Sequence, residues 1–226
     1  MPDFFASPYF GLGLTLAAYI FGVFINKKTK VAIASPIAIA LAIIITVLVV
    51  FDIKYEDYYE GGQFINMMLV PATACLAIPI FNKLALLKKN IIPIVVGCGV
   101  GAIVCIFTVT WLCSLFGLSE ELTLSMVPKS ITTPFGISLS ETIGGEPSIT
   151  VICILITGIT GAMTAPYLAK LFRIDDPLTQ GIATGTASHV LGTSKAITMG
   201  ETQGAMSGLA VPITGVITVI FSLIYF

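Results

Sequence analysis

Two polar segments in an otherwise apolar chain hold the side chains best suited to bind a ligand. The first is VPKSITTPFG, residues 127–136, in which Lys129 supplies a positive charge and Ser130, Thr132 and Thr133 supply hydroxyl groups. Ammonium and hydroxyl groups are hydrogen-bond donors that suit a small anion. We therefore expect this segment to bind a group of carboxylate size.

The second segment is GIATGTASHVLGTSKAITMG, residues 181–200, which surrounds the single histidine of the chain. A lone histidine without a neighbouring cysteine does not provide the ligands of a metal site. Hydroxyl groups and a lysine fit carboxylate recognition better, so we expect neither a metal nor another cofactor. The candidate binding residues of this segment are Thr186, Ser188, His189, Thr193 and Lys195.

Each of these side chains also has a plain structural interpretation. Lys129 follows Glu121 by eight residues and Lys195 lies near a segment end, so either ammonium group can reach the membrane interface by snorkelling. His189 can be a packing residue instead of a ligand or proton relay. The adjacent pair of Lys129 and Ser130 allows a Ser/Lys hydrolase, but no base-to-nucleophile geometry supports it, and we expect no enzyme.

Both segments also contain residues that interrupt a helix. Pro134 lacks an amide donor and follows β-branched threonines, a combination that disfavours a continuous helix. A break leaves free amide groups at the start of the next half-helix, and these attract anions. The predicted helix-break residues are Pro128, Pro134, Gly136, Gly185 and Gly192.

The composition places these segments in a membrane protein. Of the 226 residues, 56% are hydrophobic and 10% are charged, and the mean hydropathy is +1.01. The 11 basic and 12 acidic residues nearly cancel, which argues against a nucleic-acid-binding surface. The five cysteines lie in apolar runs and show no paired spacing, so we expect buried thiols instead of disulfides.

Six charge-free runs are long enough to cross the bilayer as helices. Basic loops at 27–30 and 83–89 alternate with acidic loops at 52–60 and 120–121. By the positive-inside rule the N-terminus is outside and the basic loops are cytoplasmic. The six predicted spans are 4–26, 31–51, 61–82, 90–119, 147–169 and 202–226.

In this topology the two polar segments make no net crossing and are expected to be broken or re-entrant. At an offset of 56 residues, Ser130 aligns with Thr186 and Thr132 with Ser188. Such similarity between segments that enter from opposite sides is typical of the inverted repeats of secondary transporters.

The expected fold is therefore all-α and polytopic, with six transmembrane helices plus two broken or re-entrant helical segments in an inverted repeat. We expect residues 1–90 to form a three-helix scaffold and residues 91–226 to form the transport core. Within the core the two inverted units are 122–170 and 178–226.

Three strings resemble the signature regions of the LrgB/CidB family: MVPKSITTPFGISLSETIGGEPSIT, ITGITGAMTAPYLAKLFRI and GIATGTASHVLGTSKA. The resemblance covers nearly the whole chain and implies a multi-pass protein of the plasma or inner membrane, antiholin-like or holin-like, linked to murein hydrolase activity and lysis. It also implies a small LrgA/CidA-type membrane partner and similarity to plastidic glycolate/glycerate translocators. Where relatives often have a basic pair with arginine, this chain has Thr193-Ser194-Lys195, and lysine offers no bidentate fork.

Residues and resemblance together predict a transporter of small monocarboxylates, of the pyruvate, lactate or glycolate/glycerate type, that works by alternating access. We expect a homo-oligomer in the lipid bilayer with a small organic anion as substrate. The alternative is an antiholin-like or holin-like pore or regulator of murein hydrolase export and cell lysis.

Overall fold

The computed structural model describes residues 5, 7–29, 36–68, 71, 81 and 84–226, with residues 86 and 87 described in their backbone only. Within these residues every regular element is a helix, which confirms the predicted all-α class. The chain forms two compact units, Met1–Ala74 and Cys75–Phe226. The division into a scaffold and a transport core stays a prediction.

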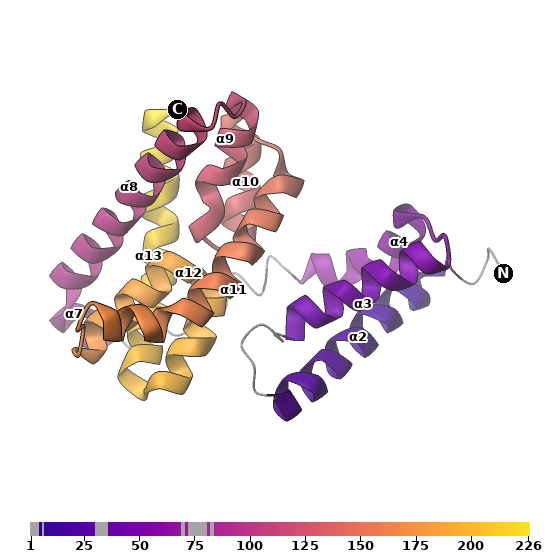
Figure 1. Cartoon of the computed structure of the whole chain (residues 1–226), viewed down its shortest axis with the longest axis horizontal. Coiled ribbons are helices and arrows are strands. Elements are labelled where there is room, and N and C mark those ends of the chain that lie inside the picture. The colour runs from indigo at the N-terminus through magenta and orange to yellow at the C-terminus, as the bar shows by residue number, and fades with distance from the viewer. Residues whose placement is uncertain (1–4, 6, 30–35, 69–70, 72–80, 82–83) are drawn as a thin grey trace. The chain divides into compact units, whose positions relative to one another are not determined.

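The first unit consists of α2 (Pro8–Thr29), α3 (Pro36–Val50) and α4 (Tyr55–Met67), coloured indigo to purple in Figure 1. Glycines bring α2 and α4 together, because a Cβ atom on Gly61 would lie 2.8 Å from the Cα atom of Gly11. One turn further along α2, Thr15 Oγ1 and the hydroxyl group of Tyr58 are hydrogen-bonded at 2.8 Å. Close contact through small residues is usual between membrane helices.

The third predicted span, 61–82, differs from the structure at its start. α4 begins at Tyr55, and Glu56 and Asp57 occupy its first turn. Carboxylates are favourable there because they face the positive end of the helix dipole, so an acidic stretch expected as a loop begins a helix. α4 ends at Met67, and most of the remaining predicted span lies outside the described residues.

The described part of the second unit begins with a short helix and a long helix, continues with a broken segment of three short helices, and ends with three further long helices. In chain order these are α7 (Leu84–Lys89), α8 (Ile91–Leu115), α9 (Glu120–Met126), the 3₁₀ helix η1 (Val127–Ser130), α10 (Thr133–Ile143), α11 (Pro147–Leu171), α12 (Pro177–Met199) and α13 (Glu201–Tyr225). In the described part of the chain, α2, α8, α11 and α13 are long and apolar enough to cross a membrane, and α3 is a shorter apolar helix.

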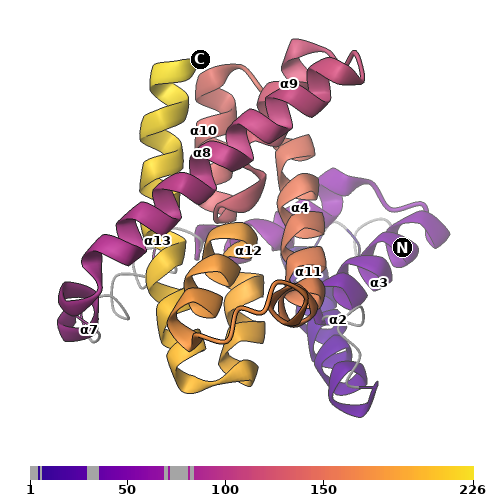
Figure 2. The same ribbon diagram turned by 60° about the vertical axis from the view of Figure 1, so that its left-hand side comes forward.

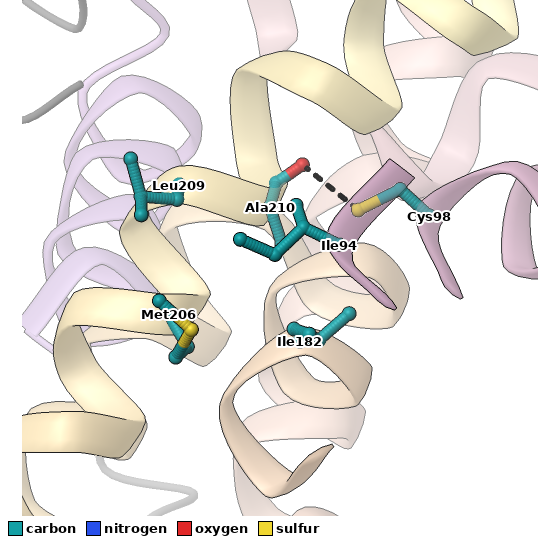
Figure 3. Close-up of a cluster of buried hydrophobic side chains, with 6 residues drawn as sticks. All are labelled: Ile94, Cys98, Ile182, Met206, Leu209 and Ala210. Atoms are coloured by element: carbon teal, nitrogen blue, oxygen red, sulfur yellow. Dashed lines mark hydrogen bonds between the residues drawn. The ribbon is translucent and has the colours of Figure 1, made fainter. Parts of the chain in front are cut away.

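α8, α12 and α13 enclose the main hydrophobic core of the second unit (Figure 3). Its buried members are Ile94, Cys98, Ile182, Met206, Leu209 and Ala210. The thiol of Cys98 points at the carbonyl oxygen of Ala210 across 3.8 Å, so this cysteine packs as a small apolar residue. The core fixes the first half of α12 between two long helices.

The outer face of α8 carries a different set of residues. Val96, Val100 and Val104 recur every four residues and are each more than half exposed. Side chains at this spacing lie on one face of a helix. An exposed valine row of this kind suits contact with hydrocarbon and separates the outside of α8 from its core face.

The broken segments occupy opposite ends of the second unit. α12 contacts the first half of α13, where Gly181 meets Gln203 and Gly185 meets Ser207. α10 instead faces residues 216–223 of α13 across a groove. Figures 1 and 2 agree, with α10 beside the C-terminal end of α13 and α12 beside its beginning.

Candidate functional site

The first break in the helices lies at Ile131 and Thr132. Both residues are extended, with φ −105° and ψ 174° at Ile131 and φ −66° and ψ 147° at Thr132. α10 then begins at Thr133, with Pro134 in its first turn. A proline fits there because its missing N–H group would have no partner within the helix. Pro128 lies before the break, in η1.

The ammonium group of Lys129 contacts a thiol and a hydroxyl group next to this break. Lys129 Nζ lies 3.2 Å from Cys105 Sγ and 3.4 Å from Ser130 Oγ. These two atoms lie 3.2 Å apart, so the three groups form a triangle between η1 and α8. Among the described residues no carboxylate is paired with Lys129. A half-buried cation in such surroundings favours an anionic ligand.

The hydroxyl group of Thr132 is buried without a partner. Thr132 is 5% exposed, and its Oγ1 atom has no hydrogen bond to any described residue. The residue occupies the N-cap position of α10, yet its side chain accepts no amide hydrogen. Leaving a buried hydroxyl unpaired costs about 1–3 kcal/mol. A ligand that accepts from this hydroxyl would remove that cost.

Free amides of α10 lie beside this hydroxyl. The first hydrogen bond of the helix runs from Gly136 N–H to the Thr132 carbonyl oxygen at 2.8 Å. The N–H groups of Thr133 and Phe135 come before it and so have no partner within the helix. They add the partial positive charge of a helix N-terminus to the charge of Lys129.

The second break lies at Ser188 and His189, within α12. Ser188 has φ −136° and ψ 16°, and His189 has φ 43° and ψ −141°. The chain reverses here, because a Cβ atom on Gly192 would lie 2.8 Å from the carbonyl oxygen of Thr184. A positive φ is unusual for a residue with a side chain and costs about 1–3 kcal/mol. The histidine side chain must therefore be held by its surroundings.

α11 holds both residues of the second break. His189 Nε2 lies 2.9 Å from the carbonyl oxygen of Ile154, and since a carbonyl only accepts, Nε2 carries the hydrogen. The ring lies on Gly158, where a Cβ atom would come within 2.6 Å of Nε2. Ser188 Oγ lies against Gly161, where a Cβ atom would collide with it. These glycines make room for the two side chains.

The two breaks meet at the centre of the second unit. On α8, Gly101 contacts Thr186 and Cys105, one turn later, contacts Ser130. On α11, the side chain of Ile154 packs on Gly136 of α10 while its carbonyl oxygen binds His189. Each of these helices thus touches both broken segments within about one turn.

α13 joins the two segments in the same way. Thr214 Oγ1 donates to Thr186 Oγ1 across 3.3 Å. The next residue, Gly215, faces the ring of Phe135 in α10, where a Cβ atom would lie 2.7 Å from Cδ2. Predicted binding residues of both segments, among them Ser130, Thr186 and His189, therefore lie around one region enclosed by α8, α11 and α13.

Not every predicted binding residue is free to meet a ligand there. Thr186 Oγ1 donates to Cys98 Sγ across 3.4 Å, and Thr193 Oγ1 pairs with Ser207 Oγ at 2.8 Å. Thr133 is half-buried in the first turn of α10. Lys195 lies six residues beyond His189, about 9 Å along the helix, and its side chain bonds to none of the other predicted residues that the structure describes.

The three glycines predicted as helix breaks lie inside helices instead. Gly136 is within α10, and Gly185 and Gly192 are within the two halves of α12. Each allows a close approach: Gly136 to Ile154, Gly185 to Ser207 and Gly192 to Ser188. Glycine serves helix packing in membranes as readily as it interrupts a helix, and packing is its role here.

Several residues that contact the two breaks could not be identified as functional from the sequence. Cys105 lies in an apolar run, and Ile154 has an ordinary apolar side chain and acts through its backbone oxygen. Gly158 carried one signal, because Ile156-Thr157-Gly158 matches Ile213-Thr214-Gly215 once one residue of slippage is allowed in the repeat. The part of the chain that the structure describes holds no group of three or more His, Cys, Asp or Glu residues suited to a metal ion.

Comparison with known proteins identifies the family. The model of the LrgB-like family matches residues 15–226. YxaC of Bacillus subtilis (strain 168), described as uncharacterized, is 37% identical over 204 residues, which cover 90% of this chain and 89% of YxaC. The antiholin-like protein LrgB of Bacillus cereus (strain B4264) is 34% identical over 215 residues, covering 95% and 94% of the two chains. No solved structure matches.

The Bacillus cereus relative is named as an antiholin-like protein and not as an enzyme. The long apolar helices and the family together identify a multi-pass membrane protein. The chain belongs to the LrgB-like family.

Proposed function

We propose that this protein is a secondary transporter of small monocarboxylates, of the size of pyruvate, lactate, glycolate or glycerate, and that it works by alternating access. The observation that carries the proposal is the Lys129 ammonium, which has no described carboxylate partner, in the same break as the unpartnered, buried Thr132 hydroxyl. A cation and an orphaned donor in one place match the charge and the acceptors of a carboxylate.

In the proposed site the carboxylate binds at the start of α10. Lys129 neutralises its charge, and the Thr132 hydroxyl and the first free amides of α10 donate hydrogen bonds to its oxygens. Ser188 contributes from the second segment, and His189 positions that segment through Ile154. Ser130, Thr133, Thr186 and Thr193 line or support the same region.

Reciprocal contacts support an inverted repeat for this core. Gly158 of α11 touches Leu191, where a Cβ atom would lie 2.8 Å from Cδ1, and Gly215 of α13 touches Phe135. The two glycines are 57 residues apart and align in the repeat after one residue of slippage, and Phe135 and Leu191 are 56 residues apart. Each long helix thus contacts the start of the second half-helix of the other repeat unit. Two units related in this way suit rocking of one part around a shared site.

α8 carries a second reciprocal pair. Cys105 contacts Ser130 at 3.2 Å and Cys98 contacts Thr186 at 3.4 Å, and Ser130 and Thr186 are again 56 residues apart. The midpoint between the two cysteines falls at Gly101 and Ala102, which is where a local two-fold axis would cross α8.

We assign the protein to the plasma or inner membrane with its N-terminus outside. The basic ends of α7 and α11, with Lys88, Lys89 and Lys170, lie at one end of the second unit, and α9, with Glu120 and Glu121, lies at the other (Figure 2). Segregation of basic residues to one end agrees with the positive-inside rule.

The second candidate function is an antiholin-like pore or regulator of murein hydrolase export and lysis, with a small LrgA/CidA-type membrane partner or a homo-oligomer as the working assembly. The name of the Bacillus cereus relative favours it. A pore needs no cation held against a thiol and a hydroxyl group, so the surroundings of Lys129 favour the transporter.

Purified protein in liposomes distinguishes the two candidates. Labelled pyruvate, lactate and glycolate are supplied with and without a proton gradient, and release of a trapped dye is recorded in parallel. A transporter gives saturable uptake that other acids of two to four carbons inhibit, without dye release. Dye release that no carboxylate saturates, with no uptake in either condition, would overturn the proposal in favour of the pore.

A further inference from the structure

A cavity of about 180 Å³ lies between α11 and the first half of α12. Its principal lining residues are small: Gly161, Ala165 and Ala169 of α11 face Ala183, Ala187 and Ser188 of α12. The three residues of α11 recur every four positions and therefore form one row along the helix. The cavity follows this row.

Rows of small residues normally let membrane helices pack closely, but here a cavity remains beside the row. At its rim the side chain of Gln180 is held by two hydrogen bonds. Gln180 Nε2 donates to the carbonyl oxygen of Ile174 at 2.7 Å, and Gln180 Oε1 accepts from Gln203 Nε2 at 3.1 Å. Both ends of the Gln180 amide are thus occupied. The side chain stays at the rim and leaves the row of small residues uncovered.

Ser188 is the free polar group at the inner end of the cavity. Thr164 and Thr184 also line it, but their hydroxyl groups donate to the carbonyl oxygens of Thr160 and Gln180 at 2.9 and 2.7 Å. Ser188 is 1% exposed, and no described residue is hydrogen-bonded to its hydroxyl group. A buried hydroxyl directed at a cavity is ready to donate to a ligand.

The cavity runs from the basic end of the unit to the second break. Gly161 and Ala169 are eight residues apart, about 12 Å along α11. The outer end lies at Ile174, in the connection that also carries the exposed cation Arg173, and the exposed Lys170 lies just before it in the last turn of α11. Asp176 in this connection is engaged in capping α12, where it accepts from Thr179 N–H at 2.8 Å. The connection also carries the exposed carboxylate of Asp175, so an anion that enters here passes two cations and this acidic residue.

We propose that this cavity is the route by which a short-chain carboxylate reaches the second break from the basic end of the protein. Ser188 donates a hydrogen bond to the carboxylate, and Ala165, Ala183 and Ala187 limit the length of the acid. The inference rests on the proposed transport function. The volume lies below the roughly 300–1,000 Å³ of pockets for drug-sized ligands, which fits acids of two to four carbons.

Cysteine accessibility tests the route without relying on transport. Ala165→Cys places a thiol in the cavity, and Ala162→Cys places one on the same helix, three residues away and outside the lining. Both variants and the wild type, which reports the native cysteines, are treated with an anionic methanethiosulfonate from each side of the membrane. Peptide mass spectrometry then gives the rate of modification at each cysteine.

The expected result is modification of Ala165→Cys about tenfold or more faster than of Ala162→Cys, from the basic side only, and protection by lactate but not by its neutral amide. Equal rates at the two positions, reaction from the opposite side only, or no protection by any acid would overturn the route. Protection by lactate without uptake by wild-type liposomes would retain the route and reject transport. Uptake without modification of Ala165→Cys would retain transport and reject the route.

A selectivity ratio provides an independent test that does not depend on the amount of folded protein. In Ala165→Val the cavity is shorter, so uptake of lactate relative to glycolate should fall roughly 10- to 200-fold, the discrimination typical of one methyl group in a tight pocket. Ala162→Val is the matched control and should leave the ratio unchanged. An unchanged ratio in Ala165→Val would exclude Ala165 as a determinant of length.

Discussion

At the scale of single residues, Lys129 and Lys195 differ in what surrounds them, although each stands beside a serine in the sequence. The ammonium group of Lys129 reaches across to Cys105 on α8. Lys195 lies well beyond the second break and bonds to none of the predicted binding residues that the structure describes. The two lysines should therefore differ in their effect on substrate binding.

Lys129→Met keeps the length of the side chain and removes its charge. Loss of one partner of a charged pair costs about 2–5 kcal/mol, so carboxylate affinity should fall by roughly 30-fold or more. Binding of labelled lactate to detergent-solubilised protein measures it. Lys195→Met is the control and should bind as the wild type does. Wild-type carboxylate affinity in both variants would assign Lys129 to snorkelling at the interface.

His189 combines a strained backbone with a fixed side chain. Its φ of 43° suits glycine, yet its ring is bonded to Ile154 and packed on Gly158. His189→Ala loses the ring contacts and keeps the strain, whereas His189→Gly loses the ring contacts and relieves the strain. We expect the glycine variant to be the more stable of the two by roughly 1–3 kcal/mol.

Thermal unfolding in detergent measures this difference, with His189→Gln as a third variant, since its amide can still donate to the Ile154 oxygen. Glutamine should recover part of the stability that alanine loses. If the alanine and glycine variants have the same melting temperature, the backbone at position 189 is not strained in the membrane protein.

At the scale of elements, glycines set how closely the broken segments approach the long helices. Gly158 and Gly215 each face a side chain that belongs to the other unit of the inverted repeat. By contrast, no heavy atom lies within 4 Å of a Cβ atom placed on Gly208. The same substitution therefore has opposite consequences at these positions of α11 and α13.

Gly158→Ala and Gly215→Ala should each lower the free energy of unfolding by about 1–3 kcal/mol, because the added methyl group displaces His189 or Phe135. Gly208→Ala should be neutral or should stabilise by up to about 1 kcal/mol, since alanine is the better helix former. Melting temperatures of the three variants report the difference. Similar values for all three would contradict the packing described for the junction.

The start of α12 is sensitive to acid. The hydroxyl group and then the N–H group of Thr179 hold the pKa of Asp176 below its ordinary value. A depressed pKa in the folded state means that the cap stabilises fully above the ordinary aspartate range and is lost as pH falls through the lowered value. Hydrogen exchange of the first turn of α12 should lose protection in that acidic window.

Thr179→Val removes the hydroxyl donor, so the pKa of Asp176 should rise towards its ordinary value and protection should be lost at a higher pH than in the wild type. Asp176→Asn cannot titrate and serves as the control. Loss of protection at the same pH in the wild type and in Thr179→Val would show that the hydroxyl group does not govern the cap.

At the scale of the whole molecule, the basic and acidic ends of the second unit predict its orientation. A C-terminal fusion should lie outside and a tag inserted after Arg173 should lie inside, because the positive-inside rule assigns Lys170 and Arg173 to the cytoplasmic end. Protease accessibility in right-side-out and inside-out vesicles measures both. Both tags on one side would contradict an odd number of crossings by α13.

Much of this arrangement could be predicted from local chemistry. Pro134 and the β-branched residues before it restrict the backbone directly, so the sequence locates the first break closely. The alignment of Thr132 with Ser188 likewise relates two residues that both lie at breaks. Such features depend on near neighbours in the chain and are visible without the fold.

The rest depends on neighbours that are distant in the chain. Gly136, Gly185 and Gly192 look like helix breakers, and only their packing partners show that they admit another segment. Cys105 joins Lys129 because α8 passes beside η1, which no spacing in the sequence indicates. α4 begins within acidic residues that were expected in a loop because the helix dipole accommodates them.

The contact between Phe135 and Gly215 has a consequence for biosynthesis. Gly215 is made 80 residues after Phe135, so at about 5–20 residues per second the ribosome needs roughly 4–16 s to supply the partner of the first broken segment. Until then that segment lacks its contact with α13, although α8 and α11 have already been made. The contacts of α13 with the two broken segments therefore form only after this helix has been synthesised and inserted, and its loss would remove the contacts that Thr214 and Gly215 make with them.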